Sequence, residues 1–91
     1  MNQRQAVVEI SNRSPFKSSA LSASTRQPYG SGWLNHQELM QLEADHADID
    51  YTVYSYATPI AWHTPRGWHV VAQRFSVTTS KHQSKVRQAV R

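Results

Sequence analysis

The chain has 91 residues, of which 38% are hydrophobic and 10% aromatic, and its formal net charge is +4. This length accommodates one small domain and excludes two independent cores, while the aromatic content excludes a wholly disordered chain. The sequence contains no cysteine, which excludes disulfides, thiolate zinc sites and a cysteine nucleophile.

Charge is unevenly distributed along the chain. All six acidic residues lie within the first fifty positions, whereas residues 51–91 carry six of the ten basic residues and no acid. The apolar run at residues 6–10 is interrupted by Glu9, so it is too short for the core of a signal peptide. No stretch approaches the ~18 apolar residues of a transmembrane helix. We therefore expect a cytoplasmic protein that does not bind a membrane.

The first third of the chain is predicted to hold one strand and one long loop. Residues 6–10 are rich in valine and isoleucine, which favours a β-strand. Residues 11–32 are rich in Ser, Thr, Pro, Asn and Gly, and we expect a Ser-rich loop that is partly disordered. A loop of this length in a small domain is typical of a functional or mobile segment.

The clearest predicted helix covers residues 33–46. Asn35 is a favourable N-cap residue, and Glu38 follows at the spacing of a capping box, with Asn in place of Ser or Thr. Leu39 and Leu42 provide one apolar stripe. Three aspartates follow Leu42 at the negative end of the helix dipole, which favours termination there.

The second half of the chain predicts a β-hairpin followed by a helix. Residues 51–62 and 68–79 are β-branched and aromatic, and residues 63–67 supply the proline and glycine of a turn. Ser80 and Gln83 have the spacing of a capping box that opens a helix over residues 80–90. The predicted fold is a single α+β domain, residues 1–91, in which two helices cover an antiparallel hairpin or sheet in the order β-loop-α-β-β-α.

Two stretches resemble a known family. They are Tyr54-Ser-Tyr-Ala-Thr-Pro-Ile-Ala-Trp-His63 and Phe75-Ser-Val-Thr-Thr-Ser-Lys-His-Gln83. They resemble uncharacterised small proteins encoded mostly by phages of mycobacteria and related actinobacteria. The resemblance implies a phage accessory protein made in the host bacterial cytoplasm. It carries over no catalytic residue.

The histidines and aspartates do not predict a metal site. His63 and His69 flank the predicted turn, where a hairpin can bring two side chains to face one another. Zinc requires three or four ligands, however, and neither a cysteine nor a nearby carboxylate joins this pair. The acidic run at residues 45–50 lacks the glycine and terminal glutamate of a calcium-binding EF-hand loop. We therefore expect no metal and no cofactor.

A small metal-independent nuclease or hydrolase is a second alternative. A histidine would act as the base and a neighbouring group would stabilise developing negative charge. The candidate bases are His63, His69 and His82, and the candidate stabilising groups are Tyr54, Arg74 and Lys81. Because no spacing enforces their proximity, we expect no enzyme and no catalytic residue.

A phosphate site of the P-loop type is also not expected. The run at residues 76–83 leads into a helix N-terminus and includes Lys81, a combination able to hold an anion. It lacks the glycines of a P-loop. A strand end followed by a capping box explains the same residues more simply.

Binding is the remaining class of function. Basic and aromatic residues interleave in the C-terminal half, a composition typical of nucleic-acid binding, and the candidate contacts are Arg66, Arg74, Lys81, Lys85, Arg87 and Arg91. An aromatic-rich surface is equally typical of protein interfaces, and the candidates there are Trp33, Tyr54, Tyr56, Trp62 and Trp68. We expect binding to a host or phage protein, or self-association into a homo-oligomer, with nucleic-acid binding as the first alternative.

Overall fold

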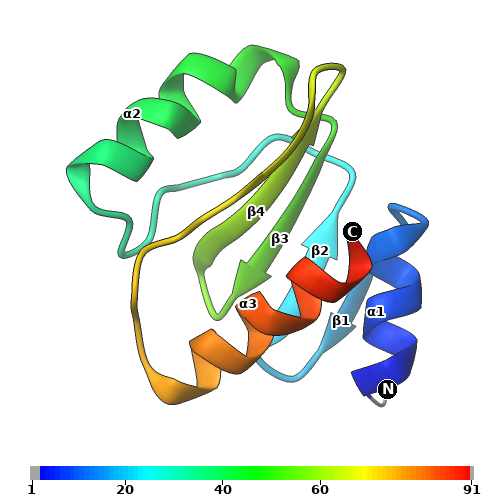
Figure 1. Ribbon diagram of the computed structural model, residues 1–91. Helices are drawn as coiled ribbons and strands as arrows, with labels where there is room; N and C mark the ends of the chain where they lie inside the picture. Colours follow the sequence, from blue (N-terminus) through cyan, green and yellow to red (C-terminus); the bar gives the residue numbers. More distant parts are fainter. Residues whose placement is uncertain (1–2, 91) are drawn as a thin grey trace.

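The computed structural model describes residues 3–90, which form a five-stranded antiparallel sheet and three α-helices. The elements in chain order are α1 (Gln3–Ser11), β1 (Phe16–Ser18), β2 (Leu21–Ser24), α2 (His36–Asp45), a 3-10 turn η1 (His46–Asp48), β3 (Tyr51–Ser55), β4 (Thr58–Thr64), β5 (Gly67–Val70) and α3 (Val77–Ala89). The strands lie in the sheet in the order in which they occur along the chain (Figure 1). The predicted α+β class with an antiparallel sheet is confirmed.

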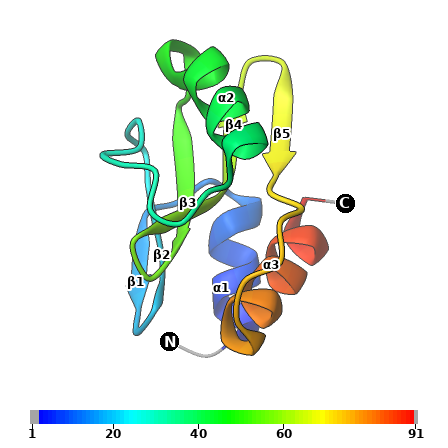
Figure 2. The same cartoon turned by 90° about the vertical axis from the view of Figure 1, so that its left-hand side faces the viewer.

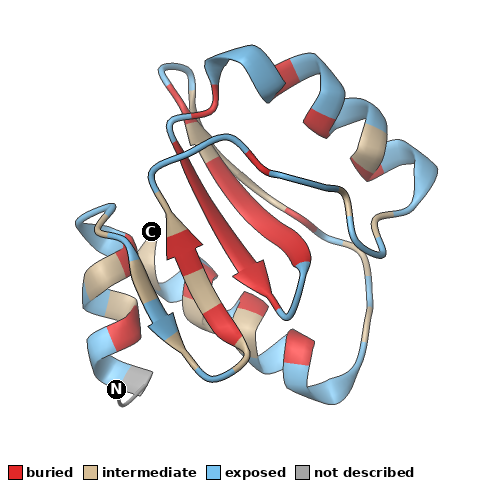
Figure 3. Cartoon of the chain, turned by 180° about the vertical axis from the view of Figure 1, so that it is seen from behind, coloured by how far each residue is buried: buried red, intermediate tan, exposed pale blue. Residues whose placement is uncertain are grey.

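Helices cover both faces of the sheet. α1 and α3 lie side by side on one face (Figures 1 and 2), where Ile10 and Val86 pack against the central strands. α2 packs on the opposite face, where Leu42 contacts the fully buried Trp62 of β4. As a result the central strands β3 and β4 are buried along almost their whole length (Figure 3). In the described part of the chain, no helix is long and apolar enough to cross a membrane.

The predicted strand at residues 6–10 is wrong, because this segment belongs to helix α1. Ala6 and Ile10 are buried and stand one helical turn apart, whereas Val8 between them is 48% exposed. The spacing of four between the buried residues is helical and outweighs the β-propensity of the valines.

The predicted loop over residues 11–32 contains the hairpin of β1 and β2. Leu21 and Ala23 alternate with half-buried serines in β2, which gives the period of two that a strand requires. Ser19 adopts the left-handed conformation (φ 55°) in the connecting turn. The alternation of buried and half-buried positions involves small residues such as serine and alanine, so the composition of this segment did not indicate a strand.

The segment 51–62, predicted as a single strand, is two strands joined by a turn at residues 56 and 57. Tyr56 adopts a left-handed conformation there (φ 57°), which sequence rules do not expect of tyrosine. The next hairpin, between β4 and β5, is confirmed with its turn at residues 65 and 66. Gly67 supplies the expected positive φ (120°).

The predicted ends of two later elements also differ from the structure. The strand expected over residues 68–79 ends at Val70. Helix α3 begins at Val77 rather than near residue 80, because Ser76 is its N-cap and accepts a hydrogen bond from the Thr79 amide at 3.2 Å. Residues 71–76 therefore connect β5 to α3.

The N-cap of α2 is confirmed, but the capping box is not closed by Glu38. The Asn35 side chain accepts a hydrogen bond from the Glu38 amide at 2.9 Å. The Glu38 carboxylate turns away from the cap and accepts hydrogen bonds from His69 (2.8 Å) and from the amide of Ala72 (2.9 Å). Glu38 thus joins α2 to β5 and to the segment that leads into α3.

Candidate binding surface

The five aromatic residues predicted for an interface divide into buried and exposed groups. Tyr54 and Trp62 belong to the core and are 3% and 0% exposed. Trp68 is half-buried and packs edge-to-face on Tyr51. The structure therefore places Tyr54 and Trp62 in the core and not on the exposed surface, because a domain poor in Leu and Ile uses these rings as core.

Trp33 and Tyr56 are the two interface candidates that reach the surface, at 82% and 61% exposure. Both lie next to Thr58, at the end of the sheet where β3 turns into β4. Exposed tryptophan is unusual, because burial of its ring is strongly favourable. Two neighbouring exposed rings make this end of the sheet the candidate binding surface.

The backbone that carries Trp33 is held in place from both sides. Its amide donates to the Thr58 hydroxyl at 3.0 Å, and its carbonyl accepts from the Gln73 side chain at 2.9 Å. The other end of the Gln73 amide accepts from the Asn35 amide at 2.7 Å. Gly32 adopts φ 53° and lies directly against Thr58. The exposed ring is thus presented from a fixed support.

Trp33, Tyr56 and Phe75 line a groove of about 490 Å³, which we call the aromatic groove. Hydroxyl-bearing residues of β3, β4 and α3 complete its lining: Ser55, Thr58, Ser76 and Thr79. Their side-chain oxygens all hydrogen-bond within the protein. The groove therefore offers aromatic surface and few free polar groups. Phe75 was not among the residues predicted for a protein interface, because it is indistinguishable in sequence from a core phenylalanine.

A second cavity of about 320 Å³ adjoins the groove and shares Tyr56 with it. Its polar lining includes Thr78, Lys81, His82 and Lys85 of α3. Ser18, the last residue of β1, and Ser19, in the turn that follows it, line the other side. We call this cavity the basic pocket.

A chain of hydroxyl groups fixes the His82 side chain. Ser76 donates to the Thr79 hydroxyl at 3.2 Å, Thr79 and Ser55 hydroxyls are 3.0 Å apart, and the Ser55 hydroxyl lies 2.7 Å from His82 Nδ1. If each hydroxyl donates once along this series, Nδ1 is the acceptor and Nε2 carries the proton. Burial, and then the positive charge of Lys85, lower the pKa of His82, which favours this neutral form.

The lowered pKa of His82 predicts a pH-dependent stability. The unfolded chain keeps an imidazole pKa near 6.5, so below that pH it binds more protons than the folded chain. We expect the free energy of unfolding to fall as the pH drops below about 6.5 and to level off below the folded-state pKa. Urea unfolding between pH 8 and pH 4.5 should show this component in the wild type and in His36→Gln, a control at an exposed position. It should be missing in His82→Gln, and its persistence there would contradict the assignment.

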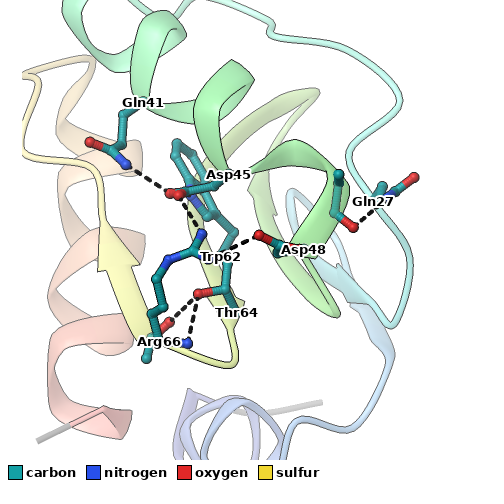
Figure 4. A network of polar contacts seen from close by, with 9 residues as sticks. Gln27, Gln41, Asp45, Asp48, Trp62, Thr64 and Arg66 are labelled. Atoms are coloured by element: carbon teal, nitrogen blue, oxygen red, sulfur yellow. Dashed lines mark hydrogen bonds and ion pairs between the residues drawn. The ribbon is translucent and has the colours of Figure 1, made fainter.

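The predicted basic residues do not form one surface. Arg66 donates to Asp45 and Asp48, both at 2.9 Å (Figure 4), so its charge is satisfied within the chain. Arg74 is exposed in the segment between β5 and α3, while Lys81, Lys85 and Arg87 lie on α3. Arg91 lies outside the described residues. Among the described residues, Arg74, Lys81, Lys85 and Arg87 form no ion pair. The acidic side chains that do form ion pairs bind Arg66, His63 or His69 instead, and they are Glu38, Asp45, Asp48 and Asp50.

The two histidines that flank the β4–β5 turn are not brought together. His63 stands opposite Trp68 and pairs with Asp50 at 2.8 Å, whereas His69 stands opposite Trp62 on the other face and pairs with Glu38. They cannot share a metal ion or a substrate. Within residues 3–90 no group of three or more His, Asp or Glu side chains has the arrangement of a metal site.

Comparison with known proteins identifies a family. A model described as a family of unknown function, DUF8033, matches residues 9–89. The chain belongs to this family. The match runs from the last turn of α1 to the end of α3, and it contains the aromatic groove and all of the basic pocket except Ala6. No curated protein and no solved structure matches the chain.

Proposed function

We propose that this DUF8033 chain is a non-enzymatic binding protein whose aromatic groove receives an apolar side chain of a protein partner. The observation that carries the proposal is the 82% exposure of Trp33 on a backbone held by hydrogen bonds to Thr58 and Gln73. Tryptophan and tyrosine dominate the energetics of protein interfaces. A support that is already ordered lowers the entropy lost on binding.

The chemistry of the groove favours a protein side chain over a polar ligand. The hydroxyl groups of Ser55, Thr58 and Thr79 are occupied by hydrogen bonds inside the chain. The exposed rings of Trp33 and Tyr56 flank the opening. An apolar or aromatic side chain inserted between them would bury aromatic surface, while the hydroxyl oxygens of the lining keep their hydrogen bonds within the chain.

The resemblance to phage proteins supports a proposal about where the protein acts and what kind of partner it binds. We propose an accessory protein that acts in the host bacterial cytoplasm and binds a host or phage protein. A second copy of the chain, giving a homo-oligomer, would use the same exposed rings. In that case light scattering should give a dimer mass for the wild type and a monomer mass for Trp33→Ala.

A cross-linking experiment tests the groove directly. A photoreactive benzoylphenylalanine is placed at position 33 in one variant and at position 40 in another, since Met40 is also exposed (57%) but lies on α2 outside the groove. We expect a covalent adduct from position 33 alone, unchanged by nuclease treatment. Once the partner is known, Trp33→Ala should weaken its binding by about 30-fold or more, and Met40→Ala should not.

Three outcomes would count against the proposal. Equal adducts from positions 33 and 40 would indicate nonspecific contact, and no adduct from position 33 would remove the groove as the binding surface. An adduct that disappears after nuclease treatment would indicate that nucleic acid bridges the two proteins.

Nucleic-acid binding is the second candidate, and one specific observation favours it. Lys81 and Lys85 line the basic pocket next to the exposed ring of Tyr56, so cations and a stacking surface are adjacent. Such binding would weaken steeply as salt increases, because phosphate contacts release counterions. Titration of mixed-sequence DNA and RNA at two salt concentrations decides this, and no binding at low salt would exclude it.

A further inference from the structure

The basic pocket holds positive charge that forms no ion pair with the residues the structure describes. Lys81 and Lys85 stand four residues apart on α3, so their side chains lie on one side of the helix, where like charges repel. Neither makes an ion pair with any described residue. Four of the six acidic residues are engaged elsewhere, with Arg66, His63 and His69. A bound anion would relieve this repulsion.

The described lining of the pocket contains donors and no carboxylate. Thr78 contributes a hydroxyl from the first turn of α3, and Ser19 contributes another from the β1–β2 turn opposite. When the Ser55 hydroxyl donates to Nδ1, which lies 2.7 Å away, the His82 ring adds an N–H at Nε2. Two ammonium groups, two hydroxyls and an imidazole N–H on facing walls are complementary to an oxyanion with several acceptor atoms.

The size and shape of the pocket favour an ester over a free ion. Its volume of about 320 Å³ exceeds what one inorganic phosphate fills, and the ring of Tyr56 forms part of the wall. We propose that the basic pocket binds the phosphoryl group of a phosphate ester, with Lys81 and Lys85 as its counter-ions and the organic part of the ester against Tyr56. The ester is either a small molecule or a nucleic-acid strand. The proposal is independent of partner binding in the aromatic groove.

Amide NMR titration with inorganic phosphate, adenosine monophosphate and a single-stranded oligonucleotide tests the site. We expect phosphate and the monophosphate to shift the amides of residues 78–85 in a saturable manner. The double variant Lys81→Gln, Lys85→Gln should weaken binding by about tenfold or more. The matched control is Arg87→Gln, which removes an exposed charge from the same helix outside the pocket and should leave binding unchanged.

The His82 side chain provides a second readout. An anion placed among Lys81, Lys85 and the phenol of Tyr56 would oppose the effect of Lys85 on the ring. We therefore expect saturating phosphate to raise the pKa of His82, measured on its imidazole resonances. This rise in the pKa of His82 should be absent in the double variant. If the two lysines served only the structure, their replacement would not abolish the response to phosphate.

The results of the titration distinguish a nucleic-acid strand from a small phosphate ester, and they also show whether the proposal fails. Tighter binding of the oligonucleotide than of the monophosphate, still lost in the double variant, assigns the pocket to a nucleic-acid strand, and the reverse order assigns it to a small ester. No shift with millimolar phosphate or monophosphate overturns the proposal. Equal losses in Arg87→Gln and in the double variant also overturn it, because they indicate diffuse attraction. Trp33→Ala should retain phosphate binding, so a failure of the proposed partner binding in the aromatic groove can be distinguished from a failure of phosphate binding in the basic pocket.

Discussion

Replacing Asp45 with alanine should lower the free energy of unfolding by roughly 2–3 kcal/mol, because it leaves a buried donor without an acceptor. The Asp45 carboxylate accepts hydrogen bonds from the indole of Trp62, the amide of Gln41 and the guanidinium of Arg66, each at 2.9 Å (Figure 4). Trp62 is 0% exposed, so its N–H cannot turn to water. Denaturant unfolding measures the loss.

Asp48→Ala is the matched control, because Asp48 pairs with the same Arg66 but its side chain is 52% exposed. Its cost should be below about 1 kcal/mol. Adding Trp62→Phe to Asp45→Ala removes donor and acceptor together, so the double variant should lose less than the sum of the two single variants. A cost for Asp45→Ala no larger than for Asp48→Ala would contradict this role of the carboxylate.

The same network makes the protein sensitive to acid. Burial by itself raises the pKa of Asp45, but hydrogen bonds from Trp62, Gln41 and Arg66 outweigh it, and the pKa is lowered. A lowered carboxylate pKa stabilises the folded chain above the unfolded pKa of about 3.9. That contribution is lost as the pH falls through the folded-state value, and Asp45→Ala should lack it.

Gly32→Ala should lower the free energy of unfolding by about 2–4 kcal/mol, because the position excludes a side chain in two ways. Gly32 has φ 53°, a conformation that is strained for alanine. An added Cβ would also lie 2.6 Å from the Cα of Thr58, and a backbone atom cannot move aside at low cost. Thr58 holds the amide of Trp33, so the substitution should also displace the exposed ring from the aromatic groove.

Gly30→Ala is the matched control, because a Cβ at Gly30 meets nothing within 4 Å. We expect its unfolding midpoint in urea to stay near that of the wild type. Comparable losses of stability in the two variants would show that alanine is tolerated at position 32 as well as at position 30. That result would contradict the close packing of Gly32 against the backbone of Thr58.

The parts of the fold that sequence predicted are those with local signals. Asn35 caps α2 through a neighbour three residues away, and Gly67 provides the positive φ that a tight turn requires. The turn at Tyr56 has no such signal, since neither tyrosine nor Ala57 favours one, and it is imposed by pairing of β3 with β4. For α1 the β-propensity of valine conflicts with the helical spacing of Ala6 and Ile10, and tertiary packing decides.

The candidate site was predicted by residue type but not by location. Tryptophan and tyrosine serve equally well as core and as contact residues, so Trp62 and Trp33 look alike until burial is known: one is 0% and the other 82% exposed. Lys81 and Lys85 were predicted as anion contacts. Their opposite wall comes from Ser18 and Ser19, in a segment expected to be a loop. Only the tertiary fold brings the two together.

The outermost strands of the sheet limit how the molecule can associate with copies of itself. β1 has three residues and carries the exposed Lys17, and β5 has four residues. Such short edge strands, one of which carries a charged side chain, offer few free backbone groups to an incoming strand. They therefore disfavour the edge-to-edge pairing that leads to aggregation. Assembly by sheet extension is thus disfavoured, and the side chains of the surface are left to select the partner.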